Sequence, residues 1–218
     1  MANILAQIWR FLHLWLTIFR GRGIRFVIVG LQGAGKSTLL ARWPFRELLA
    51  TTPTLGFNVE TGRVGTQSLK TSFIAFDIGG VLDRFRPFWI EYFRNAQGMI
   101  FVVDSADIER IDEAREEIMR LVQENVLRDK PILVLANKQD LQGALNATEI
   151  SDLLGLHSIQ NGICSATVKE VSATSRTRSI GIHSVRDGLR WLYREIFSPF
   201  LWDFFTTVNM HRLVYDLE

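Results

Sequence analysis

Apolar residues follow two different spacings along the central part of this chain. Apolar runs that predict buried strands occur at residues 24–29, 72–76, 99–103, 132–136 and 168–172, and residues 58–64 form a more exposed one. Apolar positions three or four residues apart predict helices at residues 36–47, 108–125, 147–154 and 185–197. Because the two kinds of segment alternate, we expect an α/β domain with a mostly parallel sheet, helices on both faces and right-handed crossovers. Ligands of such a domain bind at the carboxyl ends of its strands.

The two ends of the chain differ from this central domain, which covers residues 24–197. Residues 1–23 are mainly apolar, and residues 198–218 form an aromatic-rich tail. Ser198 is a residue type that caps helices and Pro199 suits a first helical turn, so a separate tail helix is expected to begin there. Its apolar face can dock on the domain, on the amino-terminal segment or on a bilayer, and docking on the protein is favoured.

Composition narrows the function classes only slightly. The chain has 218 residues, of which 47% are hydrophobic and 22% are charged, as is ordinary for a globular protein with a full core. Its formal net charge of +2 is too small to indicate a nucleic-acid partner. The single cysteine, Cys164, excludes an internal disulfide, and the scattered histidines have no zinc-like spacing. We expect a reducing compartment and no structural zinc.

A glycine-rich stretch at residues 30–37, Gly-Leu-Gln-Gly-Ala-Gly-Lys-Ser, separates the first predicted strand from the first predicted helix. We call it the phosphate loop, because a loop in this position directs backbone N–H groups and the positive end of the helix dipole at one point. Lys36 supplies charge for the outer phosphates, and the Ser37 hydroxyl can bind the accompanying Mg2+. The nucleotide-binding residues predicted here are Gly33, Ala34, Gly35, Lys36, Ser37 and Thr38.

A candidate base-binding segment, Asn137-Lys138-Gln139-Asp140, follows the predicted strand at residues 132–136. The Asp140 carboxylate can accept hydrogen bonds from both the ring N–H and the exocyclic amine of guanine, and adenine offers no such pair of donors. We expect Asn137 to tie the loop down and the Lys138 stem to cover the face of the base. After the last strand, the backbone N–H of Ala173 is placed to donate to the guanine carbonyl.

Two further segments are predicted to sense a third phosphate. Asp77 closes a strand and can hold a water of the Mg2+ shell, and the Gly80 N–H can meet the γ-phosphate. Thr54 lies in a loop that can close over the metal and give it a second hydroxyl ligand. Both segments would order with a triphosphate and relax without it.

Together these residues resemble the small GTPases, and among them the Arf and Arf-like branch, the ADP-ribosylation-factor proteins. Besides the segments above, the resemblance rests on Gly56-Phe57-Asn58-Val59-Glu60, on Arg86-Pro87-Phe88-Trp89, on the run from Gln97 to Ser105 and on Leu154-Gly155-Leu156-His157. It covers residues 24–197 except for an apparent insertion at 175–187, of which residues 175–179 have the character of a solvated loop.

The resemblance implies a P-loop fold with a six-stranded sheet, in which residues 57–76 form an antiparallel hairpin between the two switches. In the family this hairpin shifts register between the GDP and GTP states and expels the amino-terminal helix. The implied ligands are GTP, GDP and Mg2+. The implied partners of this monomer are exchange factors, GTPase-activating proteins and effector proteins, which in the family engage aromatic positions matching Phe57, Phe76 and Tyr92. The implied location is the cytoplasmic face of an endomembrane (Golgi, endosome or lysosome), with roles in vesicle trafficking and protein transport.

One departure from the family affects hydrolysis. The family's switch II reads Gly-Gly-Gln and its glutamine orients the attacking water, whereas Val81 follows Gly80 here. Valine has no group that can hold water, so intrinsic GTP hydrolysis is expected to be very slow. Gln32 also replaces a common Asp and would crowd an incoming catalytic arginine. The alternatives are a constitutively GTP-bound, non-hydrolysing scaffold, or a Val81 that only packs while another group positions the water; a nucleotide kinase or ATPase is disfavoured by the guanine reader.

The amino-terminal segment is predicted to bind a membrane as a helix. Position two is Ala2, so the family's glycine-linked myristoyl group is absent. Residues 4–19 carry one narrow polar stripe, and the lipid-facing residues expected are Ile4, Leu5, Ile8, Trp9, Leu12, Trp15 and Phe19. Such a helix is about 24 Å long, shorter than a hydrocarbon core of roughly 30 Å. Lying in the interface is therefore favoured over a membrane-spanning signal anchor, and packing on the domain in the GDP state is a third possibility.

Overall fold

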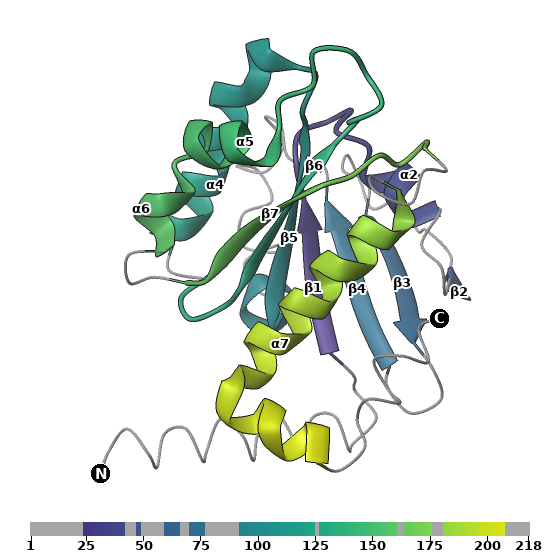
Figure 1. Ribbon diagram of the computed structural model, residues 1–218, viewed down its shortest axis with the longest axis vertical. Helices are drawn as coiled ribbons and strands as arrows, with labels where there is room; N and C mark the ends of the chain where they lie inside the picture. The colour runs from purple at the N-terminus through teal and green to yellow at the C-terminus, as the bar shows by residue number, and fades with distance from the viewer. Residues whose placement is uncertain are drawn as a thin grey trace.

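The computed structural model describes residues 24–41, 47–48, 59–65, 70–76, 92–124, 127–160, 164–175 and 181–207, and within these ranges it confirms the α/β fold (Figure 1). The described strands form one seven-stranded sheet in the order β2-β3-β4-β1-β5-β6-β7. The strands are β1 (Ile24–Val29), β2 (Glu47–Leu48), β3 (Val59–Gly65), β4 (Lys70–Phe76), β5 (Gly98–Asp104), β6 (Ile132–Asn137) and β7 (Ala166–Glu170).

The sheet is parallel from β4 to β7 and antiparallel at its other edge. β1 lies between β4 and β5, and the pairs β5–β6 and β6–β7 continue the parallel part. β3 and β4 pair antiparallel from Val59↔Phe76 to Gly65↔Lys70, which confirms the hairpin predicted at residues 57–76. The two-residue β2 pairs with β3 and adds a short seventh strand to the six that were expected.

Helices cover both faces of the sheet, as predicted. They are α2 (Lys36–Ala41), the 3-10 turn η1 (Ile108–Arg110), α4 (Ile111–Gln123), α5 (Ala147–Leu153), α6 (Leu156–Gln160) and α7 (Ile182–Thr207). Buried residues of α4, α5 and α6 share one hydrophobic cluster, and those of α2 and α7 share another. Figure 1 shows α4, α5 and α6 on one side of the sheet and α7 on the other.

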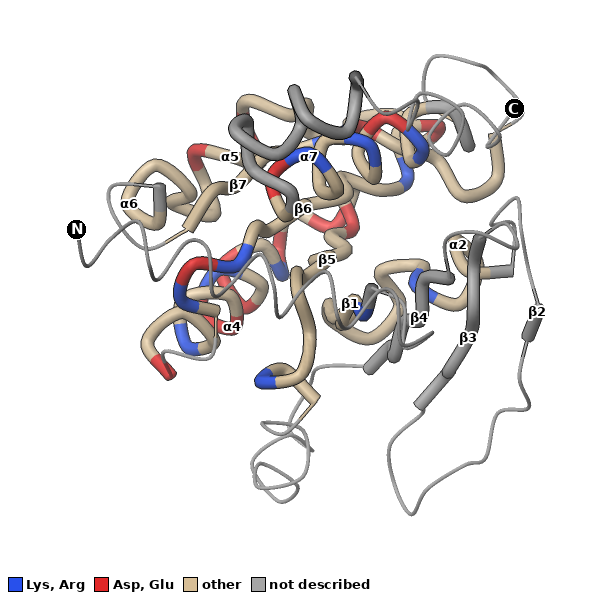
Figure 2. The backbone as a smooth tube through the Cα atoms, turned by 90° about the horizontal axis from the view of Figure 1, so that it is seen from below, with Lys and Arg blue, Asp and Glu red and all other residues tan. Residues whose placement is uncertain are grey.

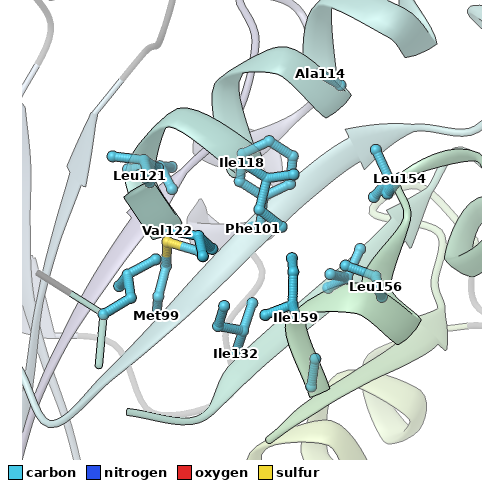
Figure 3. Packing of buried hydrophobic residues seen from close by; sticks show 14 of the residues in the cluster. Met99, Phe101, Ala114, Ile118, Leu121, Val122, Ile132, Leu154, Leu156 and Ile159 are labelled. Carbon is cyan, nitrogen blue, oxygen red and sulfur yellow. The ribbon is translucent and has the colours of Figure 1, made fainter. Parts of the chain in front are cut away.

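The two clusters follow from the two-residue repeat of a strand. In β1, Phe26 and Ile28 belong to the cluster under α7, whereas Val27 and Val29 belong to the cluster under α4. A strand covered on both faces is therefore apolar along most of its length, and in β1 the exposed Arg25 is the exception. Figure 3 shows the α4 side, where residues of α4 and α6 pack on Met99 and Phe101 of β5 and on Ile132 of β6. The buried stripe of α4 consists of Ile111, Ala114, Ile118, Leu121 and Val122, which is the spacing that predicted this helix.

Several predicted boundaries were wrong. The last strand, expected at residues 168–172, is β7 at Ala166–Glu170. The described part of α2 ends at Ala41, and Glu47, which was placed in the same helix, begins β2. The helix expected from residue 108 begins with a 3-10 turn, and α6 was not predicted.

The carboxyl-terminal helix corrects another expectation. α7 runs without interruption from Ile182 to Thr207, so no separate helix begins at Ser198, and Pro199 lies inside the helix. A proline in a helix interior removes one backbone hydrogen bond and favours a bend, and α7 bends in its last part in Figure 1. Within the described ranges, no helix has both the length and the apolar stretch that crossing a bilayer requires.

Candidate functional site

The phosphate loop connects β1 to α2 at the carboxyl end of the central strand, where the sequence placed it. Lys36 is the first residue of α2 and is 4% exposed. Its Nζ donates to Gly30 O at 2.7 Å and to Leu31 O at 2.9 Å. The lysine stem therefore passes under the loop, and its ammonium group is held at the loop by backbone oxygens. A fixed positive charge of this kind suits a bound phosphate.

Asn137 joins the phosphate loop to the loop that follows β7. This residue ends β6, and its side chain is 1% exposed. Its Nδ2 donates to Ala34 O at 2.8 Å, and its Oδ1 accepts from Ala173 N at 3.0 Å. The structure thus brings together three predicted site residues, with Asn137 as the tie between the two loops. Donation from Ala173 N–H to a base, which stays a prediction, would share a hydrogen that already points to Asn137.

Gly35 has to be glycine because of this tie. Its φ is +95°, in the left-handed region that residues with a side chain rarely adopt. A Cβ at Gly35 would lie only 2.3 Å from Asn137 Nδ2. The close approach of Asn137 to the loop therefore depends on the missing side chain.

Asp140 is held by two hydroxyl groups that sequence reasoning did not assign. Its Oδ1 accepts a short hydrogen bond from Ser172 Oγ, and its Oδ2 accepts from Thr174 Oγ1 at 2.8 Å. The Ser172 bond, followed by the Thr174 bond, lowers the pKa of the Asp140 carboxyl below its ordinary value. The exposed carboxylate is therefore ionised at neutral pH and keeps lone pairs for donors from a ligand.

Lys138 is oriented by a carboxylate on the neighbouring strand. Its Nζ lies 2.5 Å from Asp104 Oδ2, and Asp104 is the register partner of Asn137 at the ends of β5 and β6. Ala106 N donates to the other carboxylate oxygen of Asp104 at 3.1 Å, which fixes that side chain. Lys138 has a φ of +69°, an uncommon backbone conformation for a residue with a side chain. Uncommon conformations of this kind cluster at functional sites.

Another contact that was missed from the sequence links the end of η1 to the phosphate loop. Arg110 Nη1 donates to Gln32 O at 3.1 Å. For Asp104, strand register places it beside Asn137, so the ends of neighbouring predicted strands gave a usable signal. For Arg110 the only signal was its position after the end of β5, since 78 residues separate it from Gln32.

Other predicted site residues lie outside the described residues. These are Thr54, Phe57, Asp77, Gly80 and Val81, together with the membrane residues Ile4, Leu5, Ile8, Trp9, Leu12, Trp15 and Phe19. Of the other effector positions, Phe76 ends β4, where its backbone pairs with Val59, and Tyr92 has a side chain that is 43% exposed. Ser37 and Thr38 are exposed residues in the first turn of α2, beside Lys36.

Comparison with known protein families finds a match that spans most of this chain. The family described as the ADP-ribosylation factor family matches residues 11–196. The match covers more than half of the 218 residues and includes every described element from β1 to β7.

Proposed function

The chain belongs to the ADP-ribosylation factor family, and we propose that it is a membrane-surface switch that recruits effectors in its GTP state and hydrolyses GTP slowly. Members of this family are GTP-binding switches that use GTP, GDP and Mg2+ and work with exchange factors, GTPase-activating proteins and effectors at cytoplasmic membrane surfaces. The finer parts of the proposal concern the residues that bind guanine and phosphate, the rate of hydrolysis and the mode of membrane attachment.

The observation that carries guanine-nucleotide binding is the pair of hydrogen bonds made by Asn137. These bonds hold the phosphate loop and the loop of Ser172 to Thr174 at a fixed separation. The second loop in turn orients the Asp140 carboxylate. A phosphate cradle and an ionised acceptor pair are thus tied together, which is what a ligand with phosphates at one end and guanine at the other requires.

The residue types around the phosphate loop fit Mg2+. Ser37 offers a hydroxyl oxygen at an exposed position of the first turn of α2, and hydroxyl and water ligands suit this hard cation. In the proposal Ser37 and Thr54 bind the metal directly and Asp77 binds it through water. When bound, Mg2+ neutralises charge on the phosphates. Lys36 adds a fixed ammonium group, and its backbone partners keep that group at the loop.

Slow hydrolysis follows from the side chain of Val81. Phosphoryl transfer depends on a positioned nucleophile and on charge neutralisation, and a valine removes the positioning group while it leaves the binding residues in place. A non-hydrolysing, constitutively GTP-bound scaffold is the limiting case of the same proposal. The rate of hydrolysis separates the two.

Two measurements test the nucleotide proposal. The purified full-length protein is expected to carry GTP or GDP, which mass spectrometry of the released nucleotide identifies, and to bind fluorescent GDP much more tightly than fluorescent ADP. Equal affinity for the two would refute the assignment of guanine. In single-turnover hydrolysis, Val81→Gln is expected to be faster than the unchanged protein, and equal rates would refute the role given to Val81.

The proposed mode of membrane attachment is an amphipathic helix at residues 4–19 that lies in the lipid interface. Trp and Leu on its broad apolar face suit that depth, and Arg20, Arg22 and Arg25 add attraction to anionic headgroups. Alkaline carbonate extraction of membranes should release the protein. Resistance to extraction would instead indicate a membrane-spanning anchor.

A further inference from the structure

Backbone carbonyls of the phosphate loop are held by donors from several parts of the fold. The pairs are Gly30 O and Leu31 O with Lys36 Nζ, Gln32 O with Arg110 Nη1, Ala34 O with Asn137 Nδ2, and Gly35 O with Leu39 N. In a planar trans peptide, the carbonyl of one residue and the N–H of the next point in opposite directions. When the carbonyl is bound by a donor of the protein, the N–H of the next residue is therefore directed away from that donor. These donors therefore decide which backbone N–H groups of the loop are available to a phosphate.

The side chain of Arg110 is held by two neighbouring carboxylates as well as by the loop. It lies where η1 ends and α4 begins, with a φ of −103° and a ψ of 9°. Its Nε is 2.9 Å from Glu113 Oε2, and its Nη1 is 3.8 Å from Asp107 Oδ2. The planar guanidinium group can make these contacts and still donate to Gln32 O.

The peptide that Arg110 holds is one that can easily flip. Gln32 precedes Gly33, whose φ is +84°, and glycine accepts either sign of φ at little cost. A pocket lined in part by Gln32, Asp107 and Arg110 lies between the loop and α4, so this side of the peptide is not closed by dense packing. A Cβ at Gly33 would meet no atom of the described residues within 4 Å, so open space lies beside this glycine.

We propose that Arg110 is a positioning residue for the outer phosphates of the nucleotide. Its hydrogen bond to Gln32 O keeps the Gln32–Gly33 peptide oriented with the Gly33 N–H toward the phosphate and prevents a flip that would present a carbonyl oxygen there. This inference rests on the proposed nucleotide-binding function and adds to it a residue at the end of η1, which acts through the loop backbone.

Long-range attraction between the arginine and the phosphates is the competing explanation. Figure 2 shows acidic residues among the basic ones along α4, and Asp107 and Glu113 both lie within 4 Å of the guanidinium group. Their two carboxylates offset its charge at a distance. Substituting Arg110 still removes one positive charge, so salt dependence distinguishes the two explanations. An effect that comes from the hydrogen bond should change little when salt screens exposed charges.

The test compares GDP with GMP, which lacks the outer phosphate, by competition with fluorescent GDP on the full-length protein. Arg110→Met keeps most of the stem and removes the donor, and it is expected to weaken GDP binding on the order of tenfold, as loss of a hydrogen bond to a charged group does. GMP binding should change by less than about twofold. Arg110→Lys retains a donor, so its affinity for GDP should lie between that of the unchanged protein and that of Arg110→Met. Arg120→Met is the matched control, because Arg120 forms a similar pair with Glu117 on the same helix.

The outcomes separate this inference from the proposed function. If the unchanged protein fails to bind GDP, the proposed function itself is refuted. If it binds GDP and Arg110→Met binds GDP equally well, or loses affinity for GDP and GMP by the same factor, only the role of Arg110 is overturned. The same conclusion follows if the loss disappears at physiological ionic strength, about 0.15 M, after being present at low salt. A lower GMP-to-GDP ratio of dissociation constants, seen at both salt concentrations, supports the positioning role, and the ratio is independent of any general loss of folded protein.

Discussion

Replacing Asn137 with alanine should destabilise the protein more than any other single polar substitution at the site. The change removes the bond from Nδ2 to Ala34 O and the bond from Ala173 N to Oδ1. Both backbone partners are deeply buried, with Ala34 1% and Ala173 7% exposed. A buried group left without a partner costs about 1–3 kcal/mol, so the two together should lower the free energy of unfolding by about 2–6 kcal/mol. This is a large fraction of the roughly 5–15 kcal/mol that stabilises a typical domain.

Urea unfolding followed by circular dichroism, at a fixed excess of GDP, measures this loss. A separate GDP titration allows the contribution of bound nucleotide to be subtracted, which is about 2.7 kcal/mol at a hundredfold excess over the dissociation constant. Asn146→Ala is the matched control: Asn146 Oδ1 also accepts from two backbone N–H groups, those of Thr148 and Glu149, but it is an exposed helix cap. That variant should lose about 1 kcal/mol and keep its affinity for GDP. If Asn137→Ala loses no more than the control, water satisfies the buried groups and the reasoning is refuted.

Three further predictions concern single positions. Gly35→Ala should abolish binding of fluorescent GDP, because its Cβ would lie 2.3 Å from Asn137 Nδ2. Gly143→Ala is the control and should keep binding, because Gly143 also has a positive φ, +81°, but a Cβ there would meet nothing within 4 Å. Retained binding in Gly35→Ala would contradict the role of the bond between Asn137 and the phosphate loop. Asp140→Asn should weaken GDP and favour xanthosine diphosphate in a competition titration, since the amide can donate to a carbonyl where guanine has an amine, and an unchanged preference would argue against Asp140 as the base reader. Burial lowers the pKa of Lys130 from 10.5 to about 8, so between these values the unfolded chain binds more protons and stability should rise with pH. Urea unfolding between pH 8 and 9 should show this slope, and Lys130→Met should lack it.

Most of the sheet was predictable because its central strands are apolar on both faces. β6 is a continuous apolar run, and β1 is apolar except for Arg25. Both end at polar or glycine residues, so their limits were found to within a residue. β7 was misplaced by two residues because it is only half-buried beyond Ala166, and its apolar signal is weak. α6 has five residues, too few for a helical period to appear.

Secondary-structure prediction from local sequence was wrong at Glu47 and Pro199, where tertiary contacts determine the element that forms. Glu47 belongs to a helix by its surroundings in sequence, but it pairs with Arg63 of β3 in a two-residue strand. Pro199 is typical of a helix start, yet α7 is already established by Val185, Leu189 and Leu192, which are buried against the sheet, and it continues past the proline.

For the candidate site, the motifs predicted which residues meet but not how they are held. Asn137 was expected to tie down a loop, and its partner Ala34 lies 103 residues away. The hydroxyl groups of Ser172 and Thr174 were close to the residue that was chosen, Ala173, but their bonds to Asp140 depend on the curvature of the loop after β7. Strand order brings these ends together, and neither composition nor periodicity contains that information.

In the proposed function, the residues that bind the nucleotide differ from the residue that affects hydrolysis, so the change at Val81 is expected to slow hydrolysis and to leave nucleotide affinity intact. Asn137 ties the phosphate loop to the end of β6 and to the loop after β7, and Arg110 ties it to the junction of η1 and α4. Lys36 binds carbonyl oxygens within the phosphate loop itself. In the proposal, Val81 lacks a group that acts on water, whereas guanine and phosphate are held by other residues. We therefore expect nucleotide affinity and hydrolysis to change independently, so that a protein that retains GTP needs only the second change.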